Sequence, residues 1–461
     1  MHLKLSKGHD FRLSNHPSQE VIDVSAEASQ VILHPLDFPY IKPKLLLKDG
    51  SEVNVGTPVF IDKLNPNIKF VSPVSGNIEK IEYGERRSIQ SITINNDSNY
   101  TAIQETSQEA KGEEGVEKNI LPMDKNSWIN SLTESGLWTL IRQRPFSKIA
   151  DPDSAPKSIF ISLYDTRPYG CNPELVISSN KEFFNNGIKL LGKIADCPIH
   201  ITAGRDFDLD LINIGNQRSC NIHSIEGPHP AGNVGVQIHH IDPILSKENI
   251  CWYLDVNSLI DLGYFFDHKG YNPYKIISVC GEDLSTPNFR KIVKNQSLDS
   301  ILSSDEIQTK NYRVISGDML SGSEKDLNCG ISNYDDMLTI LFKDEKREFL
   351  GWINPGFSKY SLSNTFLSKL LSNLVLKTNS RLNGEKRSII SFGRWEEVLP
   401  MDIMPEELVK SILIEDLESM ENLGIYECAE EDFALCSYVC QSKTEVSQII
   451  KRGLELSALD V

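Results

Sequence analysis

A strand–helix–strand pattern in the middle of the chain constrains the fold more than any other feature. Residues 158–165 read SIFISLYD, a continuous apolar run typical of a buried strand. Residues 181–196 follow with an amphipathic pattern, and residues 199–204, IHITAG, form a second apolar run. Strands that alternate with a helix at this spacing predict a parallel, doubly wound α/β unit. The apolar residues near helical spacing are Phe184, Ile188, Leu191 and Ile194.

The rest of the chain divides by composition. Residues 1–100 contain short β-branched runs broken by Gly, Pro, Asn and Asp, which is typical of a β-rich unit. Residues 101–119 are rich in Glu, Ser, Thr and Gly and poor in large apolar residues, so we expect a linker there. Residues 249–270 predict a strand that runs into a helix, and residues 271–323 predict a compact α+β segment.

Helices are expected on both sides of this α/β unit. Ser127 is the expected N-cap of a helix in which Trp128, Leu132, Trp138 and Ile141 share one face, although Gly136 interrupts the pattern. The C-terminal part offers three further helical stretches. Pro405 and Gly424 occupy favoured positions at a helix start and after a helix end. The three stretches are residues 362–374, 405–424 and 432–455.

Composition excludes several classes of protein. The formal net charge of −17 argues against nucleic acid or a bare anionic lipid surface as partner, since both are polyanions. No run of about 18 apolar residues occurs, so we expect no transmembrane segment. The first residues have no apolar core of a secretory signal, and nine scattered cysteines without a CxxC pair fit reduced thiols in a cytosol.

Lys63 is a candidate for covalent modification. Residues 49–81 resemble the biotinyl/lipoyl carrier fold, in which a lysine at a hairpin tip carries the swinging arm. The Asp62–Lys63 pair stands where that hairpin is expected, so Lys63 is the corresponding residue. The alternative interpretation, which we favour, is that the fold serves as a docking module and Lys63 is an ordinary surface lysine.

A loop rich in Gly, Pro and His, residues 226–243, raises the possibilities of a phosphate, metal or quinone site. Its AGNVG at residues 231–235 has two glycines three apart and lacks the GxGxxG fingerprint of dinucleotide binding. We expect its adjacent His239 and His240 to point to opposite faces of a strand, which disfavours a shared metal. Cys428, Cys436 and Cys440 lack the spacing of a cubane cluster, so packed or free thiols are favoured. No complete catalytic motif occurs.

Seven ordered stretches between residues 42 and 440 resemble one family, the NqrA family of the sodium-translocating NADH:quinone oxidoreductases (Na⁺-NQR). The most specific are RPFSK with DPDSAPKSIF, between residues 144 and 160, and GPHPAG at residues 227–232. Gln441 stands where the family typically has Pro. The chain lacks the cluster cysteines of the related RnfC proteins, which favours the sodium-pump family.

The resemblance implies a multidomain α/β architecture. It comprises a biotinyl/lipoyl-like β domain, a linker, a Rossmann-like α/β domain, a ubiquitin-like SLBB domain and a mainly helical C-terminal domain. The corresponding residues are 1–100, 101–126, 127–270, 271–323 and 324–461.

The resemblance also implies a role. Family members are peripheral proteins on the cytoplasmic face of the bacterial inner membrane, in a six-subunit complex that couples NADH oxidation and ubiquinone reduction to Na⁺ export. Flavins and iron–sulfur centres reside in the partners NqrB to NqrF, and NqrA, which lies close to NqrB, carries no cofactor of its own. An isolated chain of this kind is not expected to be catalytic. The alternative is a purely structural docking role in the same complex.

Two segments are implied to contact the quinone, residues 33–41 (LHPLDFPYI) and 141–148 (IRQRPFSK). A quinone ring needs apolar walls and donors to its carbonyl oxygens. The alternative role for the basic residues is to form ion pairs at a domain or subunit interface. Pro35 and Pro39 make the first segment differ from the family's usual glycine-bearing version. The implied quinone-binding residues are Phe38, Tyr40, Ile41, Ile141, Arg142, Arg144, Phe146 and Lys148.

Overall fold

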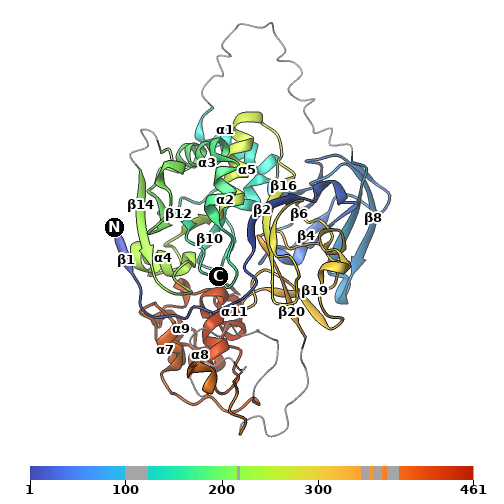
Figure 1. Cartoon of the computed structure of the whole chain (residues 1–461). Helices are drawn as coiled ribbons and strands as arrows, with labels where there is room; N and C mark the ends of the chain where they lie inside the picture. Colours follow the sequence, from blue (N-terminus) through green and yellow to red (C-terminus); the bar gives the residue numbers. More distant parts are fainter. Residues whose placement is uncertain are drawn as a thin grey trace, which may run out of the picture.

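The computed structural model describes residues 1–98, 123–214, 219–343, 353–357, 359, 366–370 and 384–459. Figure 1 shows two small sheets (blue) beside a larger one (mainly yellow), an α/β domain (green) on their other side and helices (orange to red) below. Most of the expected linker at residues 101–126 and most of the expected helix at residues 362–374 fall outside the described residues. In the described part of the chain no helix is long and apolar enough to span a membrane.

Seven described strands form the sheet of the α/β domain. Five run parallel, and β10 pairs antiparallel with β15 at one side, which confirms the predicted parallel unit. In spatial order they are β1 (His2–Lys4), β14 (Cys220–Glu226), β13 (Ile199–Gly204), β12 (Ser158–Leu163), β15 (Cys251–Leu254), β10 (Arg142–Arg144) and β11 (Lys148–Ile149). Its helices are α1 (Lys125–Glu134), α2 (Pro173–Ser178), α3 (Lys181–Ile194), α4 (Val234–Ile241) and α5 (Val256–His268).

The α/β sheet buries both faces, because side chains alternate along each strand. Ile159 and Ile161 of β12 pack in one cluster with Phe184 of α3 and Leu259 of α5. Phe160 between them points to a second cluster, which contains α4 and the C-terminal helices. The apolar run that predicted this strand therefore reflects two separate cores.

The expected helix before this sheet begins earlier and ends sooner than predicted. Asp124 is the N-cap of α1, and its carboxylate accepts a hydrogen bond from the Ser127 backbone N–H at 2.9 Å, so the prediction of Ser127 as N-cap was wrong. The helix ends at Glu134, because Gly136 is left-handed with φ of +76°. Trp138 lies in a following 3₁₀ turn and still reaches the core.

The N-terminal barrel domain consists of two small antiparallel sheets around an apolar core. Lys63 follows β6 directly and is exposed, between the two strands where the hairpin was expected. The first sheet contains β3 (Gln30–Leu33), β9 (Ile89–Asn96), β8 (Gly76–Tyr83) and β5 (Glu52–Val53). The second contains β4 (Pro43–Leu45), β6 (Pro58–Asp62) and β7 (Lys69–Val71).

The third domain is a six-stranded sheet that takes strands from two distant parts of the chain. Its edge strand β2 (Ser18–Asp23) pairs with β17 in parallel, so the first residues do not belong to the barrel. Its other strands are β19 (Ser323–Lys325), β18 (Tyr312–Ser316), β20 (Met337–Phe342), β16 (Tyr274–Cys280) and β17 (Asn288–Val293), with the short helix α6 (Leu298–Ile301).

The C-terminal domain is helical and covers the α4 face of the α/β sheet (Figure 1). The helix predicted over residues 405–424 divides in two, because Asp416 caps a second helix through the Ser419 backbone N–H. Phe11, between β1 and β2, packs against Tyr438 with 5.1 Å between ring centroids. The helices are α7 (Arg394–Val398), α8 (Pro405–Leu413), α9 (Leu417–Asn422), α10 (Ala434–Val439) and α11 (Val446–Leu459).

We predict that Gly263→Ala destabilises the protein by about 1–3 kcal/mol, the usual cost of overpacking. A Cβ at Gly263 of α5 would lie 1.7 Å from the carbonyl oxygen of Phe183 in α3, so the two helices would have to separate. Urea denaturation followed by circular dichroism measures the effect. Gly270→Ala is the matched control, since its nearest atom is 3.9 Å away. Equal midpoints for the two variants would contradict the close packing.

Candidate functional site at the four-domain junction

The two segments implied to contact quinone meet where all four domains converge. The Tyr40 ring of the barrel domain lies 6.0 Å from the Phe146 ring of the α/β domain, edge to face. Phe146 lies 6.0 Å from Tyr426 of the C-terminal domain in the same manner. Edge-to-face pairs at this distance are favourable. We call Tyr40, Phe146 and Tyr426 the aromatic patch.

The backbone under the aromatic patch is unusual. Tyr40, Phe146 and Ser147 have φ values of +64°, +79° and +54°, a region that residues other than glycine seldom adopt. Such conformations persist only where surrounding packing enforces them, and they concentrate at functional sites. Three such conformations therefore occur within the aromatic patch or directly beside it.

Lys148 places a cation beside the patch. Its ammonium lies 5.8 Å from the centre of the Phe146 ring. Among the described residues, its side chain has no ion pair or hydrogen bond. Tyr40 supplies a neutral hydroxyl. Burial raises the pKa of this hydroxyl, and the nearby carboxylates of Glu455 and Glu430 raise it further. Two donors thus border an apolar surface.

Arg144 serves a different purpose. Its side chain is fully buried and pairs with Glu431 at 2.7 Å and with Asp432 at 3.4 Å, both in the C-terminal domain. Asp432 also accepts a hydrogen bond from the Asn233 side chain, just before α4, at 3.1 Å. Arg144 therefore ties the α/β domain to the C-terminal domain through both of its terminal nitrogens.

Arg142 lies between two rings from different domains. Its guanidinium carbon is 4.5 Å from the ring centres of both Tyr253, in β15, and Tyr334, in the third domain. Guanidinium groups stack favourably on aromatic faces. The Tyr334 hydroxyl donates to the Thr139 carbonyl at 2.7 Å, which fixes the ring over Arg142.

Buried polar atoms without partners gather in the same region. Within the described chain, Arg142 Nε, Arg144 Nε, Ser147 Oγ and the Tyr253 hydroxyl are buried and lack a hydrogen bond. Buried polar groups are normally satisfied by protein or ordered water, so unsatisfied ones require a reason. Their concentration on one short segment and the strand beside it marks the junction as a candidate binding region.

Three further implied residues lie in the main core or pack against it. Ile141 is completely buried in the main core, and Ile41 packs against that core. Phe38 is 9% exposed and packs against Phe70 with 4.6 Å between ring centroids. Phe38 does, however, line a pocket on the other side of Tyr334, whose ring centre is 5.5 Å away.

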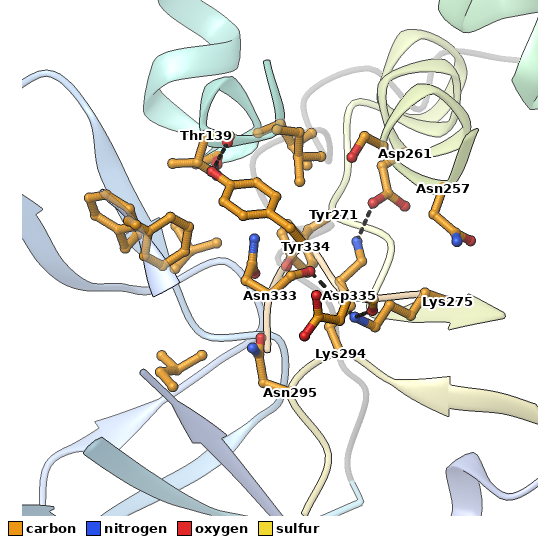
Figure 2. A pocket seen from close by; sticks show the side chains of 18 of the residues that line it. Thr139, Asn257, Asp261, Tyr271, Lys275, Lys294, Asn295, Asn333, Tyr334 and Asp335 are labelled. Carbon is orange, nitrogen blue, oxygen red and sulfur yellow. Dashed lines mark hydrogen bonds and ion pairs between the residues drawn. The ribbon is translucent and has the colours of Figure 1, made fainter. Parts of the chain in front are cut away.

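This pocket lies between the barrel, the α/β domain and the third domain (Figure 2). The space in it that water can occupy is only about 50 Å³, and the pocket is partly open to solvent. Lys294 is neutralised by Asp261 at 2.6 Å, and the Lys275 ammonium lies within 3.3 Å of three backbone carbonyls, of which Asp335 O is 2.7 Å away. Both lysines are therefore already saturated.

The glycine-rich loop packs closely against other parts of the chain. A Cβ at Gly232 would lie 2.2 Å from the Tyr164 carbonyl, and one at Gly235 would lie 2.1 Å from the Asp432 carboxylate. Other parts of the same chain therefore occupy the space beside these two glycines, and one of the neighbouring groups is the Asp432 carboxylate. The loop shapes the end of the sheet instead.

The histidines and cysteines serve packing. His239 and His240 lie on α4, so the prediction of a strand was wrong; they contact Glu427 at 2.5 Å and the Pro400 carbonyl at 2.7 Å. No three His, Cys, Asp or Glu side chains of the described residues could share a metal ion. The candidate cluster cysteines are buried free thiols: Cys428, Cys436 and Cys440.

Sequence reasoning missed Tyr253, Tyr334 and Tyr426. Each tyrosine comes from a different domain, and none belongs to a motif. The pairing of β10 with β15 brings Arg142 opposite Tyr253, and no local pattern reveals that pairing. Only the apolar character of residues 251–254, which predicted a buried strand, gave a partial signal.

Comparisons with known proteins agree along the whole chain. Family models described as the NqrA N-terminal barrel-sandwich hybrid domain and the NqrA second alpha/beta domain match residues 3–97 and 123–270. Relatives from Neisseria meningitidis serogroup B and Photorhabdus laumondii are each 31% identical, over 98% of both chains. Both are named as the A subunit of a Na(+)-translocating NADH-quinone reductase. An NAD⁺-reducing [NiFe]-hydrogenase aligns with 9% identity over 73% of this chain and 63% of its own, at a TM-score of 0.39, which is too weak to bear on function.

We predict that Arg144→Met lowers the free energy of unfolding by about 3–5 kcal/mol, because it leaves the buried Asp432 carboxylate without its partner. The matched control is Arg452→Met. Arg452 pairs with Glu415 where both side chains are about half exposed, and such pairs contribute about 0–1 kcal/mol. Thermal and urea denaturation of both variants gives the comparison, and equal losses would refute the role of Arg144 as a domain anchor.

Proposed function

Because the chain belongs to the NqrA family of Na(+)-translocating NADH-quinone reductases, we propose that it is the NqrA component of such a complex and contributes to its ubiquinone site. The complex would couple electron transfer from NADH to ubiquinone to the export of Na⁺. In this proposal the chain is peripheral to the inner membrane, at its cytoplasmic face. It binds the partners NqrB to NqrF, NqrB in particular, and the flavins and iron–sulfur centres reside in those partners.

One observation carries the proposed quinone role, the meeting of two distant segments at the aromatic patch. Tyr40 and Phe146 offer ring faces, and Lys148 is a donor without a competing carboxylate among the described residues. A quinone carbonyl oxygen accepts hydrogen bonds and its ring packs against aromatic walls. Lys148 and Tyr40 are thus the proposed donors, and Arg144 is not.

A specific observation also favours the alternative, a purely structural docking role. Phe38, Ile141 and Arg144 are buried and serve internal contacts. If the whole segment had this purpose, the quinone would be bound entirely by membrane partners. The two proposals differ in what they predict for the partly exposed residues Phe146 and Lys148.

We predict that Phe146→Ala and Lys148→Ala each raise the KM for ubiquinone in the assembled complex by about tenfold, corresponding to a lost contact of about 1.4 kcal/mol. Reduction of an artificial acceptor by NADH should be unchanged, because electrons enter elsewhere. Steady-state kinetics with both acceptors provide the measurement.

Two substitutions serve as matched controls for this experiment. Lys63→Ala removes an exposed lysine of the barrel hairpin, and Tyr83→Ala removes a ring that is 53% exposed on the barrel surface. Neither should alter the quinone kinetics. If Phe146→Ala and Lys148→Ala behave like these controls, the chain serves only for docking and the quinone role is refuted.

A further inference from the structure

The second small sheet of the barrel domain carries lysines on its outer face. Phe60 and Phe70 stack on its inner face, with 4.3 Å between ring centroids. Because side chains alternate along a strand, the residues beside these two rings point outward. Lys44 on β4, Ile61 on β6 and Lys69 on β7 lie opposite one another, so they form one row across the outer face.

The same alternation continues along β4 and the residues that flank it. Leu45 and Leu47 are partly buried and pack against the main core, whereas the residues that alternate with them are exposed. We call this outer surface the lysine face. Its members besides Ile61 are four exposed residues and one half-buried lysine: Lys42, Lys44, Leu46, Lys48 and Lys69.

The four ammonium groups of the lysine face are unpaired. None of these lysines has an ion pair or a side-chain hydrogen bond with another described residue. The carboxylate of Asp62, on β6, is 6% exposed and accepts from the backbone N–H groups of Lys42 and Leu64 at 2.8 and 3.0 Å. Asp49 and Glu52 follow the face in sequence, but Glu52 belongs to β5 of the other small sheet. Described residues therefore leave the positive charge of the face unneutralised.

This positive surface is local in a chain of net charge −17. Residues 30–97 contain eight acidic and eight basic residues, whereas residues 384–459 contain sixteen acidic and seven basic residues. The barrel (blue) and the C-terminal helices (red) lie on different sides of the molecule (Figure 1). Salt screens exposed charges beyond about 8 Å at physiological ionic strength. A surface that approaches the lysine face therefore responds to these lysines, and the net charge of the chain does not exclude a polyanionic partner there.

The composition of the lysine face distinguishes between such partners. Protein–protein interfaces are enriched in arginine and aromatic residues and depleted in lysine. The lysine face contains neither arginine nor an aromatic residue. Clusters of about four or more basic residues, with aliphatic side chains among them, are typical of surfaces that contact anionic lipid headgroups. Leu46 is 46% exposed between Lys44 and Lys48, so the face has such an aliphatic side chain.

We propose that the lysine face binds the anionic phospholipid headgroups of a membrane. The four ammonium groups lie over the lipid phosphates, and Leu46 enters the headgroup region between them. The proposal goes beyond the proposed function, because it concerns lipid and does not depend on the quinone role. It gives the barrel one orientation to the bilayer, with the outer face of the second small sheet parallel to the membrane surface.

Co-sedimentation of the purified full chain with lipid vesicles tests this proposal. One set of vesicles contains equal parts of anionic phosphatidylglycerol and neutral phosphatidylcholine, and the other contains phosphatidylcholine alone. We predict that the chain sediments with the first set and remains in solution with the second. Added salt should release it, because salt screens the attraction between lysines and phosphates. Equal sedimentation with both sets would overturn the proposal.

Two fourfold variants with the same net charge separate the lysine face from the rest of the surface. The first should no longer sediment with anionic vesicles, and it combines Lys42→Gln, Lys44→Gln, Lys48→Gln and Lys69→Gln. The control changes four exposed lysines elsewhere and should sediment like the unaltered chain; it combines Lys7→Gln, Lys181→Gln, Lys247→Gln and Lys310→Gln. Equal losses in the two variants would show that only the overall charge matters, which contradicts a defined face.

A single substitution keeps the test valid if the fourfold variant does not fold. Lys44→Gln changes an exposed side chain that has no ion pair among the described residues, so the fold is expected to persist. Its affinity for anionic vesicles should fall about fivefold, the usual contribution of one lysine near such a surface. Lys44→Arg retains the charge and should bind like the unaltered chain. Unchanged binding of Lys44→Gln would refute the proposal.

A final comparison distinguishes lipid from an acidic protein partner. If the purified chain ignores both sets of vesicles, and the fourfold variant of the lysine face fails to assemble with the membrane partners, the face binds protein and the lipid proposal is overturned. The quinone role is judged separately, by the kinetics of Phe146→Ala and Lys148→Ala. Its failure would leave the expected vesicle binding unchanged.

Discussion

The arrangement of the domains depends on one buried charge, the guanidinium of Arg144. Moving a charge out of water costs several kcal/mol, and this cost is offset only if partners are fixed in place. Glu431 and Asp432 are those partners, and both come from the C-terminal domain. Asp432 in turn contacts the residues where α4 begins. The α/β sheet, α4 and the C-terminal helices are therefore held in one mutual position, and segment 142–148 lies at its centre.

Part of this architecture follows from local patterns in the sequence. The strands at 158–163 and 199–204 and the helix at 181–194 were predicted because each carries its own periodicity. The pairing of β2 with β17 was not predictable, since it joins residues more than 260 positions apart and leaves no local trace. The N-cap of α1 was also assigned to the wrong residue. Asp124 and Ser127 are both favoured N-cap residue types, and only the observed hydrogen bond distinguishes them.

The candidate site, too, was predictable from the sequence only in part. The resemblance directed attention to residues 141–148, but not to the different roles within that segment. Arg142 and Arg144 alternate along β10 with Gln143 and so share the face that meets Tyr253. Phe146 and Lys148 follow after β10 ends and remain partly exposed. Whether a basic residue anchors a domain or faces a ligand depends on partners from other domains, which the sequence places nearly 300 residues away.

The pocket between the first three domains lies next to segment 142–148. Tyr334 lines the pocket between the barrel, the α/β domain and the third domain, and its ring also stacks on Arg142, two residues before the anchor Arg144. Its hydroxyl is held by the Thr139 carbonyl, so the ring cannot turn without the loss of that bond. A movement of the third domain that carried Tyr334 with it would break this stack on Arg142. The pocket and segment 142–148 therefore share one contact, the stack of the Tyr334 ring on Arg142.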